Sequence, residues 1–265
     1  MTLDFRAADL AALAWQVDLG ADEAIGEVPV NRFGLTDRLV SPRAPVAEAR
    51  IVTPAGAETP APVPAGPGER AASCGDLAAL RAALEGLEGV GLREGSRSTV
   101  FADGNPAARL MVIGEAPGRD EDRAGLPFVG RSGQLLDRML AAIGLSRHAA
   151  EPERAAYITN VLPWRPPQNR DPSADEAALL LPFLFRHIAL KAPEAILLLG
   201  SPAVRAVLAT ESGITRMRGR WHAWRGIPVI ATFHPAALLR DPTKKREAWA
   251  DLLTLKLRLD GGGHG

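Results

Sequence analysis

From about residue 108 onward, short apolar runs alternate with longer stretches that have helical spacing. The apolar runs cover residues 108–114, 156–160, 195–200 and 227–232, and the helical stretches cover 134–143, 173–190, 202–210 and 241–259. This alternation is typical of α/β proteins, in which each helix carries the chain back across a mostly parallel sheet. We therefore expect a mostly parallel sheet with helices on both faces.

The first part of the chain has a different character. Residues 4–20 have helical spacing, so residues 1–28 are expected to form an N-terminal helical extension. Residues 29–72 are rich in proline and alanine and poor in large apolar side chains, which predicts an extended linker. A helix over 76–92 with Asp76 as its N-cap then opens the main domain, expected to span 73–260 before a flexible glycine-rich tail at 261–265.

Charge is divided unevenly along the chain, although its sum is zero. Residues 1–92 contain 7 Lys and Arg against 13 Asp and Glu, whereas residues 93–265 contain 24 against 18. This division favours a polyanionic partner for the second part, and ordinary charge asymmetry is the alternative. The chain has one cysteine, which excludes an intramolecular disulfide and a cysteine-rich metal site within it. No run of about 18 apolar residues predicts a membrane span, and we expect a cytoplasmic monomer.

Unusual residues follow three of the expected strands, in the sequences GEAPGRDED, TNVLPWRPPQNR and TFHPAALLR. Functional loops of parallel sheets gather beyond the carboxyl ends of the strands. In the first loop, Gly114 allows close backbone approach to a ligand, and Glu115 and Glu121 are suited to orienting water or stabilising an oxocarbenium ion. A solvated acidic turn is the alternative. Phe128, in a loop bounded by proline and glycine, is suited either to stacking on a planar ring or to a local hydrophobic plug.

The second and third loops offer polar and basic groups. Asn160 presents one donor and one acceptor, which fit the edge of a pyrimidine, although asparagine is also a common turn residue. The loop that follows it carries Arg165, Asn169 and Arg170. After His234, two adjacent leucines in an apparent loop suggest a wedge into a base stack. Basic residues suited to DNA phosphates come next, with a solvated helix start as the alternative: Arg240, Lys244 and Lys245.

Taken together, these blocks resemble the family 4 uracil-DNA glycosylases over roughly residues 75–258. The resemblance implies a three-layer α/β/α fold with a central parallel four-stranded sheet. It also implies an enzyme that flips uracil out of single- or double-stranded DNA and hydrolyses its N-glycosidic bond. By position it assigns uracil binding to Gly114, Ala116, Phe128 and Asn160, catalysis to Glu115, Glu121, Asn169 and His234, and the DNA wedge to Leu238.

One departure from that family concerns its cofactor. Family 4 members typically hold a [4Fe–4S] cluster through four cysteines, and the matching positions here are Leu87, Val90, Trp164 and Leu180. A cluster of this kind needs four thiolates. We therefore expect no iron–sulfur cluster, no other cofactor and no metal, with apolar packing in the cluster's place.

Two alternatives to uracil excision remain open at this point. One is a non-catalytic DNA- or base-binding protein of the same fold. The other is a glycosylase that prefers a different deaminated base, such as hypoxanthine or xanthine, for which the small side chain of Ala116 is the relevant feature.

Overall fold

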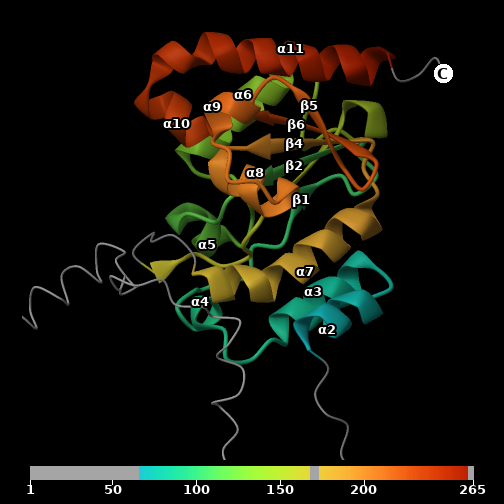
Figure 1. The fold of residues 1–265 in the computed structure, drawn as a ribbon, viewed down its shortest axis with the longest axis vertical. Coiled ribbons are helices and arrows are strands. Elements are labelled where there is room, and N and C mark those ends of the chain that lie inside the picture. Colours follow the sequence, from blue (N-terminus) through green and yellow to red (C-terminus); the bar gives the residue numbers. More distant parts are fainter. Residues whose placement is uncertain (1–65, 168–172, 262–265) are drawn as a thin grey trace, which may run out of the picture. The chain divides into compact units, whose positions relative to one another are not determined.

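The computed structural model describes residues 66–167 and 173–261 (Figure 1). The expected extension over 1–28, nearly all of the expected linker and the end of the tail lie outside the described residues. So do two of the candidate site residues, Asn169 and Arg170.

A six-stranded sheet forms the centre of the domain, in the order β1-β3-β2-β4-β6-β5. The four inner strands are parallel to one another, as expected: β2 (Leu110–Gly114), β3 (Ala156–Asn160), β4 (Ala195–Leu199) and β6 (Ile227–Thr232). Two short antiparallel strands close the edges, β1 (Asp103–Gly104) and β5 (Trp221–Trp224). The expectation of a four-stranded sheet is corrected to four parallel strands with two antiparallel edges.

The second edge strand had a signal in the sequence. Arg225 and Gly226 connect β5 to β6, and both have positive φ, at 47° and 86°. Two residues with positive φ are typical of the tight turn of a β-hairpin, because that turn matches the twist of the two strands. Arg-Gly is a less typical hairpin turn than Asn-Gly, and β5 is therefore not recognised from the sequence alone.

The inner strands are buried on both faces, which explains their continuous apolar runs. One face, with Val112 and Leu197, packs against α6 (Arg131–Ala142) and α11 (Lys245–Gly261). The other face, with Met111 and Leu198, packs against α7 (Ala174–Lys191) and α8 (Ser201–Leu208). Figure 1 shows the resulting three layers, with α11 and α7 on opposite sides of the sheet. The three-layer α/β/α architecture is confirmed.

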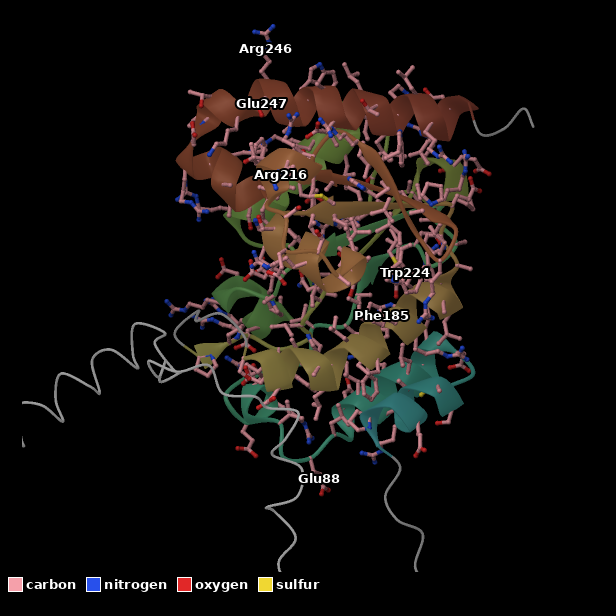
Figure 2. All side chains as sticks on the ribbon, viewed as in Figure 1. Glu88, Phe185, Arg216, Trp224, Arg246 and Glu247 are labelled. Atoms are coloured by element: carbon pink, nitrogen blue, oxygen red, sulfur yellow. The ribbon has the colours of Figure 1, made fainter. Side chains whose placement is uncertain are left out.

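Side-chain contacts tie these layers together. The rings of Phe185 on α7 and Trp224 on β5 lie 5.6 Å apart between their centroids, so that the edge strand is anchored to the helical layer (Figure 2). Ser173 and Glu176 form the expected capping box at the start of α7. No helix in the described ranges combines the length and the apolar character needed to cross a bilayer.

Three short helices precede the sheet: α2 (Pro67–Ser73), α3 (Leu77–Glu85) and α4 (Gly91–Glu94). Asp76 caps α3 as expected, with its carboxylate accepting from the Ala79 amide at 2.7 Å. The expected boundary between linker and domain at residue 72 is wrong, because α2 begins at Pro67 and packs on α7. Ala71 is buried there, and Arg186 of α7 donates to the Cys74 carbonyl.

The remaining helices are short and lie in the connections. They are α5 (Arg119–Ala124), α9 (Ile214–Met217), α10 (Pro235–Arg240) and the 3₁₀ turns η2 (Pro152–Arg154) and η4 (Pro242–Lys244). Of these, α5, α10 and η4 carry candidate site residues.

Candidate active site

A cavity of about 290 Å³ opens beyond the carboxyl ends of the parallel strands. Strand β2 ends at Gly114, β3 ends at Asn160, and His234 follows β6, so that three distant loops meet at this edge. The structure thereby brings together those residues expected to bind and cleave the base that lie within its described part. The cavity is lined by Glu115, Ala116, Pro117, Gly118, Glu121, Phe128, Ser132, Asn160, Pro166, His234 and Ala236.

Gly114 is required at the base of this cavity by the closeness of its neighbours. A Cβ atom at this position would lie 2.4 Å from Cζ of Phe128 and 2.5 Å from Oδ1 of Asn160. Real Cβ atoms do not approach other atoms so closely. The glycine therefore lets an aromatic ring and a carboxamide lie against the same strand end.

Asn160 is 6% exposed, and both polar atoms of its carboxamide are buried. Neither atom has a hydrogen-bond partner within the described part of the chain. Buried polar groups are nearly always paired, because leaving one unpaired costs about 1–3 kcal/mol. An unpaired carboxamide in a cavity wall is the expected state of a group whose partner is a ligand.

His234 begins α10 and caps it with its own side chain. Its Nδ1 atom accepts from the Ala236 amide at 3.2 Å, which requires Nδ1 to carry no proton. Burial, and to a lesser extent the positive charge of Arg240, lower the pKa of His234 to about 4 against the opposing effect of Glu121. The neutral ring therefore carries its proton on Nε2, as a hydrogen-bond donor. Its ring lies 5.5 Å from that of Phe128.

The two candidate carboxylates have different surroundings. Glu121 is buried, and its oxygens accept from three backbone amides: Oε1 from Val129 and Gly130 at 3.0 and 2.9 Å, and Oε2 from Gly118 at 3.1 Å. Glu115 is half-buried in the first loop of the same cavity. The sequence left open which of the two places water; through these contacts Glu121 holds the backbone of residues 118 and 129–130.

The expectation that Leu238 is an exposed wedge is wrong. Residues 235–240 form the helix α10 rather than a loop, with Pro235 at its first turn. On this helix Leu238 is 1% exposed and packs into the core between α6 and α11, whereas Leu239 is 37% exposed. Adjacent residues on a helix point in different directions, and the helix therefore separates the two leucines.

Several of the candidate DNA-contacting side chains are accessible. Arg240 and Lys245 are exposed, and Lys244 lies 3.2 Å from the carboxylate of Asp241. Arg165 is half-buried in the loop after β3.

The four positions that match the cluster cysteines lie together in one apolar group. Leu87, Val90, Trp164 and Leu180 are each at most 4% exposed and belong to the same buried cluster. Trp164 also donates through Nε1 to Thr99 at 3.0 Å. None of these side chains can ligate iron, and residues 66–167 and 173–261 contain no group of three or more His, Cys, Asp or Glu placed to hold a metal ion. The residues present do not fit an iron–sulfur cluster.

Sequence reasoning missed some residues of the site. Ser132 and Pro166 line the cavity, and their only signal was proximity to the recognised motifs. Arg147 lies outside the cavity and carries no motif, yet it binds the loop that holds Phe128.

The fold and cavity together define a three-layer α/β protein with a cavity at the carboxyl ends of its parallel strands. The sequence signature of the Uracil DNA glycosylase superfamily matches residues 101–253, and the chain belongs to this superfamily.

Among its relatives are proteins named type-4 uracil-DNA glycosylase. That of Sulfurisphaera tokodaii is 39% identical over 158 residues, covering 56% of this chain and 69% of the relative. That of Pyrobaculum aerophilum is 34% identical over 185 residues, covering 67% and 91%. That of Thermotoga maritima is 39% identical over 146 residues, covering 54% and 73%.

Proposed function

We propose that this protein is a monofunctional uracil-DNA glycosylase, which flips uracil out of DNA and hydrolyses its N-glycosidic bond to leave an abasic site. The observation that carries the proposal is the unpaired, buried carboxamide of Asn160 in a cavity that also contains Phe128 and His234. The names of the relatives support it.

Recognition follows from the donors and acceptors available. The glycosidic bond of a stacked base is out of reach, so the nucleotide must leave the stack. Phe128 then stacks on the ring, and Asn160 pairs with the donor and acceptor of the pyrimidine edge. Gly114 and Ala116 bound the space around the base. The exposed Leu239 takes the wedge role first assigned to Leu238, since it is the leucine of α10 that reaches solvent.

Cleavage leaves negative charge on the departing uracil and positive charge on the sugar. His234, neutral and protonated on Nε2, donates to the uracil oxygen as that charge builds. Glu115 or Glu121, together with Asn169, places the attacking water and favours the cationic sugar. Glu121 shapes the site through its backbone contacts.

DNA, single- or double-stranded, is the partner of a monomeric enzyme in this proposal. Arg240 and Lys245, with Arg165, Lys244 and Arg170, hold the phosphates. A protein that repairs cellular DNA works in the compartment that contains the DNA, and we therefore infer that this protein is cytoplasmic.

Chemistry in this enzyme proceeds without an iron–sulfur cluster. The support is the apolar packing of Leu87, Val90, Trp164 and Leu180 and the presence of one cysteine in the whole sequence. Protein purified without oxygen should contain no stoichiometric iron and lack the absorbance near 400 nm typical of such clusters. About four irons per chain would contradict the proposal.

Product release from oligonucleotides tests the activity itself. The substrates are duplexes and single strands that contain uracil, hypoxanthine or xanthine at one position. Free base should be released fastest from the uracil substrates. His234→Ala should slow single-turnover excision about 10²–10³-fold, the effect of removing one preorganised donor, while DNA affinity is kept. No base release from any substrate would instead identify a DNA- or base-binding protein.

A further inference from the structure

Phe128 has a backbone conformation that an aromatic residue rarely adopts. Its φ is 55°, in the left-handed region, and it is one of four described residues other than glycine with positive φ. Such a conformation costs about 1–3 kcal/mol and persists only where the surroundings impose it. We propose that Arg147, outside the cavity, is the residue that imposes it, and thereby positions the aromatic surface on which the base stacks. This inference rests on the proposed function.

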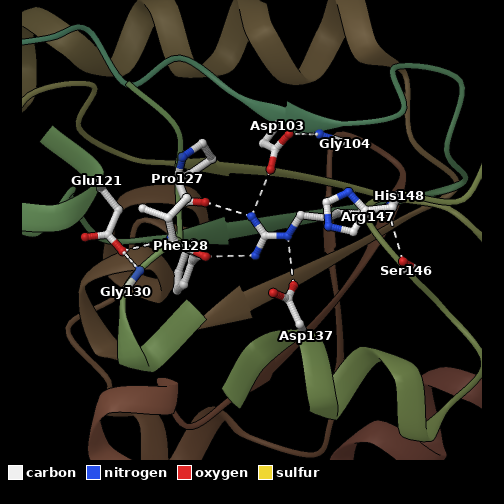
Figure 3. A network of polar contacts seen from close by, with 11 residues as sticks. Asp103, Gly104, Glu121, Pro127, Phe128, Gly130, Asp137, Ser146, Arg147 and His148 are labelled. Atoms are coloured by element: carbon white, nitrogen blue, oxygen red, sulfur yellow. Dashed lines mark hydrogen bonds and ion pairs between the residues drawn. The ribbon is translucent and has the colours of Figure 1, made fainter. Parts of the chain in front are cut away.

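Arg147 binds the backbone of the Phe128 loop directly. Its Nη1 donates to the Pro127 carbonyl at 2.8 Å and its Nη2 to the Phe128 carbonyl at 2.9 Å (Figure 3). The planar guanidinium presents both donors in a fixed fork, so two successive carbonyls are held in one relative orientation.

Two carboxylates hold the guanidinium itself in place. Nη1 lies 2.9 Å from Oδ2 of Asp103 at the sheet edge, and Nε lies 2.8 Å from Oδ1 of Asp137 on α6 (Figure 3). The Arg147 side chain is 4% exposed, so the guanidinium itself is buried, while the side chains of Asp103 and Asp137 are 24% and 43% exposed. The loop is thereby tied through Arg147 both to β1 and to α6.

Glu121 holds the other half of the same loop. Its Oε1 accepts from the amides of Val129 and Gly130, directly after the two carbonyls that Arg147 binds. A cation on two carbonyls and an anion on the next two amides fix the backbone on both sides of Phe128 (Figure 3). The loop therefore has little freedom to rotate.

The same residue packs closely at both its carbonyl and its ring. A Cβ at Gly133 would lie 1.8 Å from the Phe128 carbonyl oxygen, and a Cβ at Gly114 would lie 2.4 Å from its ring. The carbonyl is therefore pressed on α6 while the ring is pressed on the end of β2. Loss of Arg147 frees the carbonyl, and the strained backbone relaxes by rotating the ring away from its stacking position.

The test compares Arg147→Met and Arg147→Lys with the control Arg109→Met. Arg109 also forms an ion pair, with Glu194 at 2.8 Å, but it directly precedes β2, at the amino ends of the parallel strands and away from the cavity. For each variant we would measure the melting temperature, the affinity for a duplex with an abasic-site analogue, and the single-turnover rate on uracil duplex. The analogue has no base, and its affinity therefore reports the DNA contacts without the stacking surface.

Arg147→Met should slow excision by about 10²-fold, the effect of misplacing a reacting group by roughly 1 Å, and leave abasic-duplex affinity within about twofold. Arg147→Lys, which keeps the charge and one donor, should recover part of the rate, and it carries the test if the Met variant does not fold. Arg109→Met should excise normally. In a Phe128→Ala background, Arg147→Met should slow excision less than about threefold further, because the two residues act as a unit.

Three results would overturn the inference: a normal rate in both Arg147 variants, a loss of abasic-duplex affinity that matches the loss of rate, or an undiminished effect of Arg147→Met in the Phe128→Ala background. A wild-type protein that releases no uracil would instead refute the proposed function, so the two failures are distinguishable.

Discussion

Replacing Asn160 by Leu should make the protein more stable and nearly inactive. The side chain is 6% exposed, and its two polar atoms are buried without partners in the described residues. Removing such a group and filling the same space with an apolar side chain should recover about 1–3 kcal/mol of unfolding free energy. For a domain of this size that corresponds to a rise of roughly 2–4 °C in melting temperature per kcal/mol.

The same change removes the carboxamide that β3 presents for hydrogen bonding to the pyrimidine edge. Single-turnover excision should fall by at least about 10²-fold, because a site built to hydrogen-bond a base loses both bonds at once. Melting curves and excision rates of the same preparation give both numbers.

Thr159→Val is the matched control, one residue earlier on the same strand. The Thr159 hydroxyl is paired, donating to the Phe101 carbonyl at 2.7 Å. Its loss should lower stability by about 1 kcal/mol or more and leave the excision rate unchanged. If Asn160→Leu destabilises the protein as Thr159→Val does, the argument from an unpaired carboxamide is refuted. If Asn160→Leu excises uracil normally, Asn160 does not read the base.

The remaining predictions concern pH, chain length and salt. The pKa of His234 is lowered from 6.5 to about 4, so the unfolded chain protonates this ring at a higher pH than the folded chain does. The free energy of unfolding should therefore fall as the pH drops from about 6.5 toward 4. Urea unfolding at pH 7 and 5 should show a smaller drop in this free energy for His234→Ala than for the wild type, and an equal drop would contradict the assigned pKa. A chain beginning at Gly66 should keep its melting temperature and excision rate, whereas one beginning at Gly75 should lose stability because it lacks α2, which packs on α7; equal stability of the two would show that α2 is dispensable. Lys245→Ala should reduce the slope of DNA affinity against salt concentration by about one phosphate contact. Lys256→Ala, at the other end of α11, should leave this slope unchanged. Equal slopes in the two variants would place the DNA away from Lys245.

Much of the fold could be predicted from the sequence, because strands buried on both faces and capped helices have local signatures. The runs at 156–160 and 227–232 match β3 and β6, and Ser173 with Glu176 marks the start of α7. Most of the candidate pocket residues could also be named in advance, since parallel strands bring their carboxyl ends to one edge. Gly114, Phe128, Asn160 and His234 do meet around one cavity.

Other features depended on contacts between distant segments, which no local pattern specifies. Leu238 and Leu239 are identical in type, and only the helical path of α10 against α6 and α11 buries the first and exposes the second. Glu115 and Glu121 both follow β2 closely in the sequence, and only the approach of the 129–130 amides engages Glu121 in holding that backbone.

Arg147 carries no motif, and only tertiary packing brings its guanidinium to the carbonyls of Pro127 and Phe128, about 20 residues earlier in the chain. The sequence by itself determined which side chains are available to recognise and cleave a base, because their chemistry belongs to the residues. Tertiary structure decided which of them face the cavity and which hold it in shape, because that depends on the direction of each side chain and on partners far away in the chain.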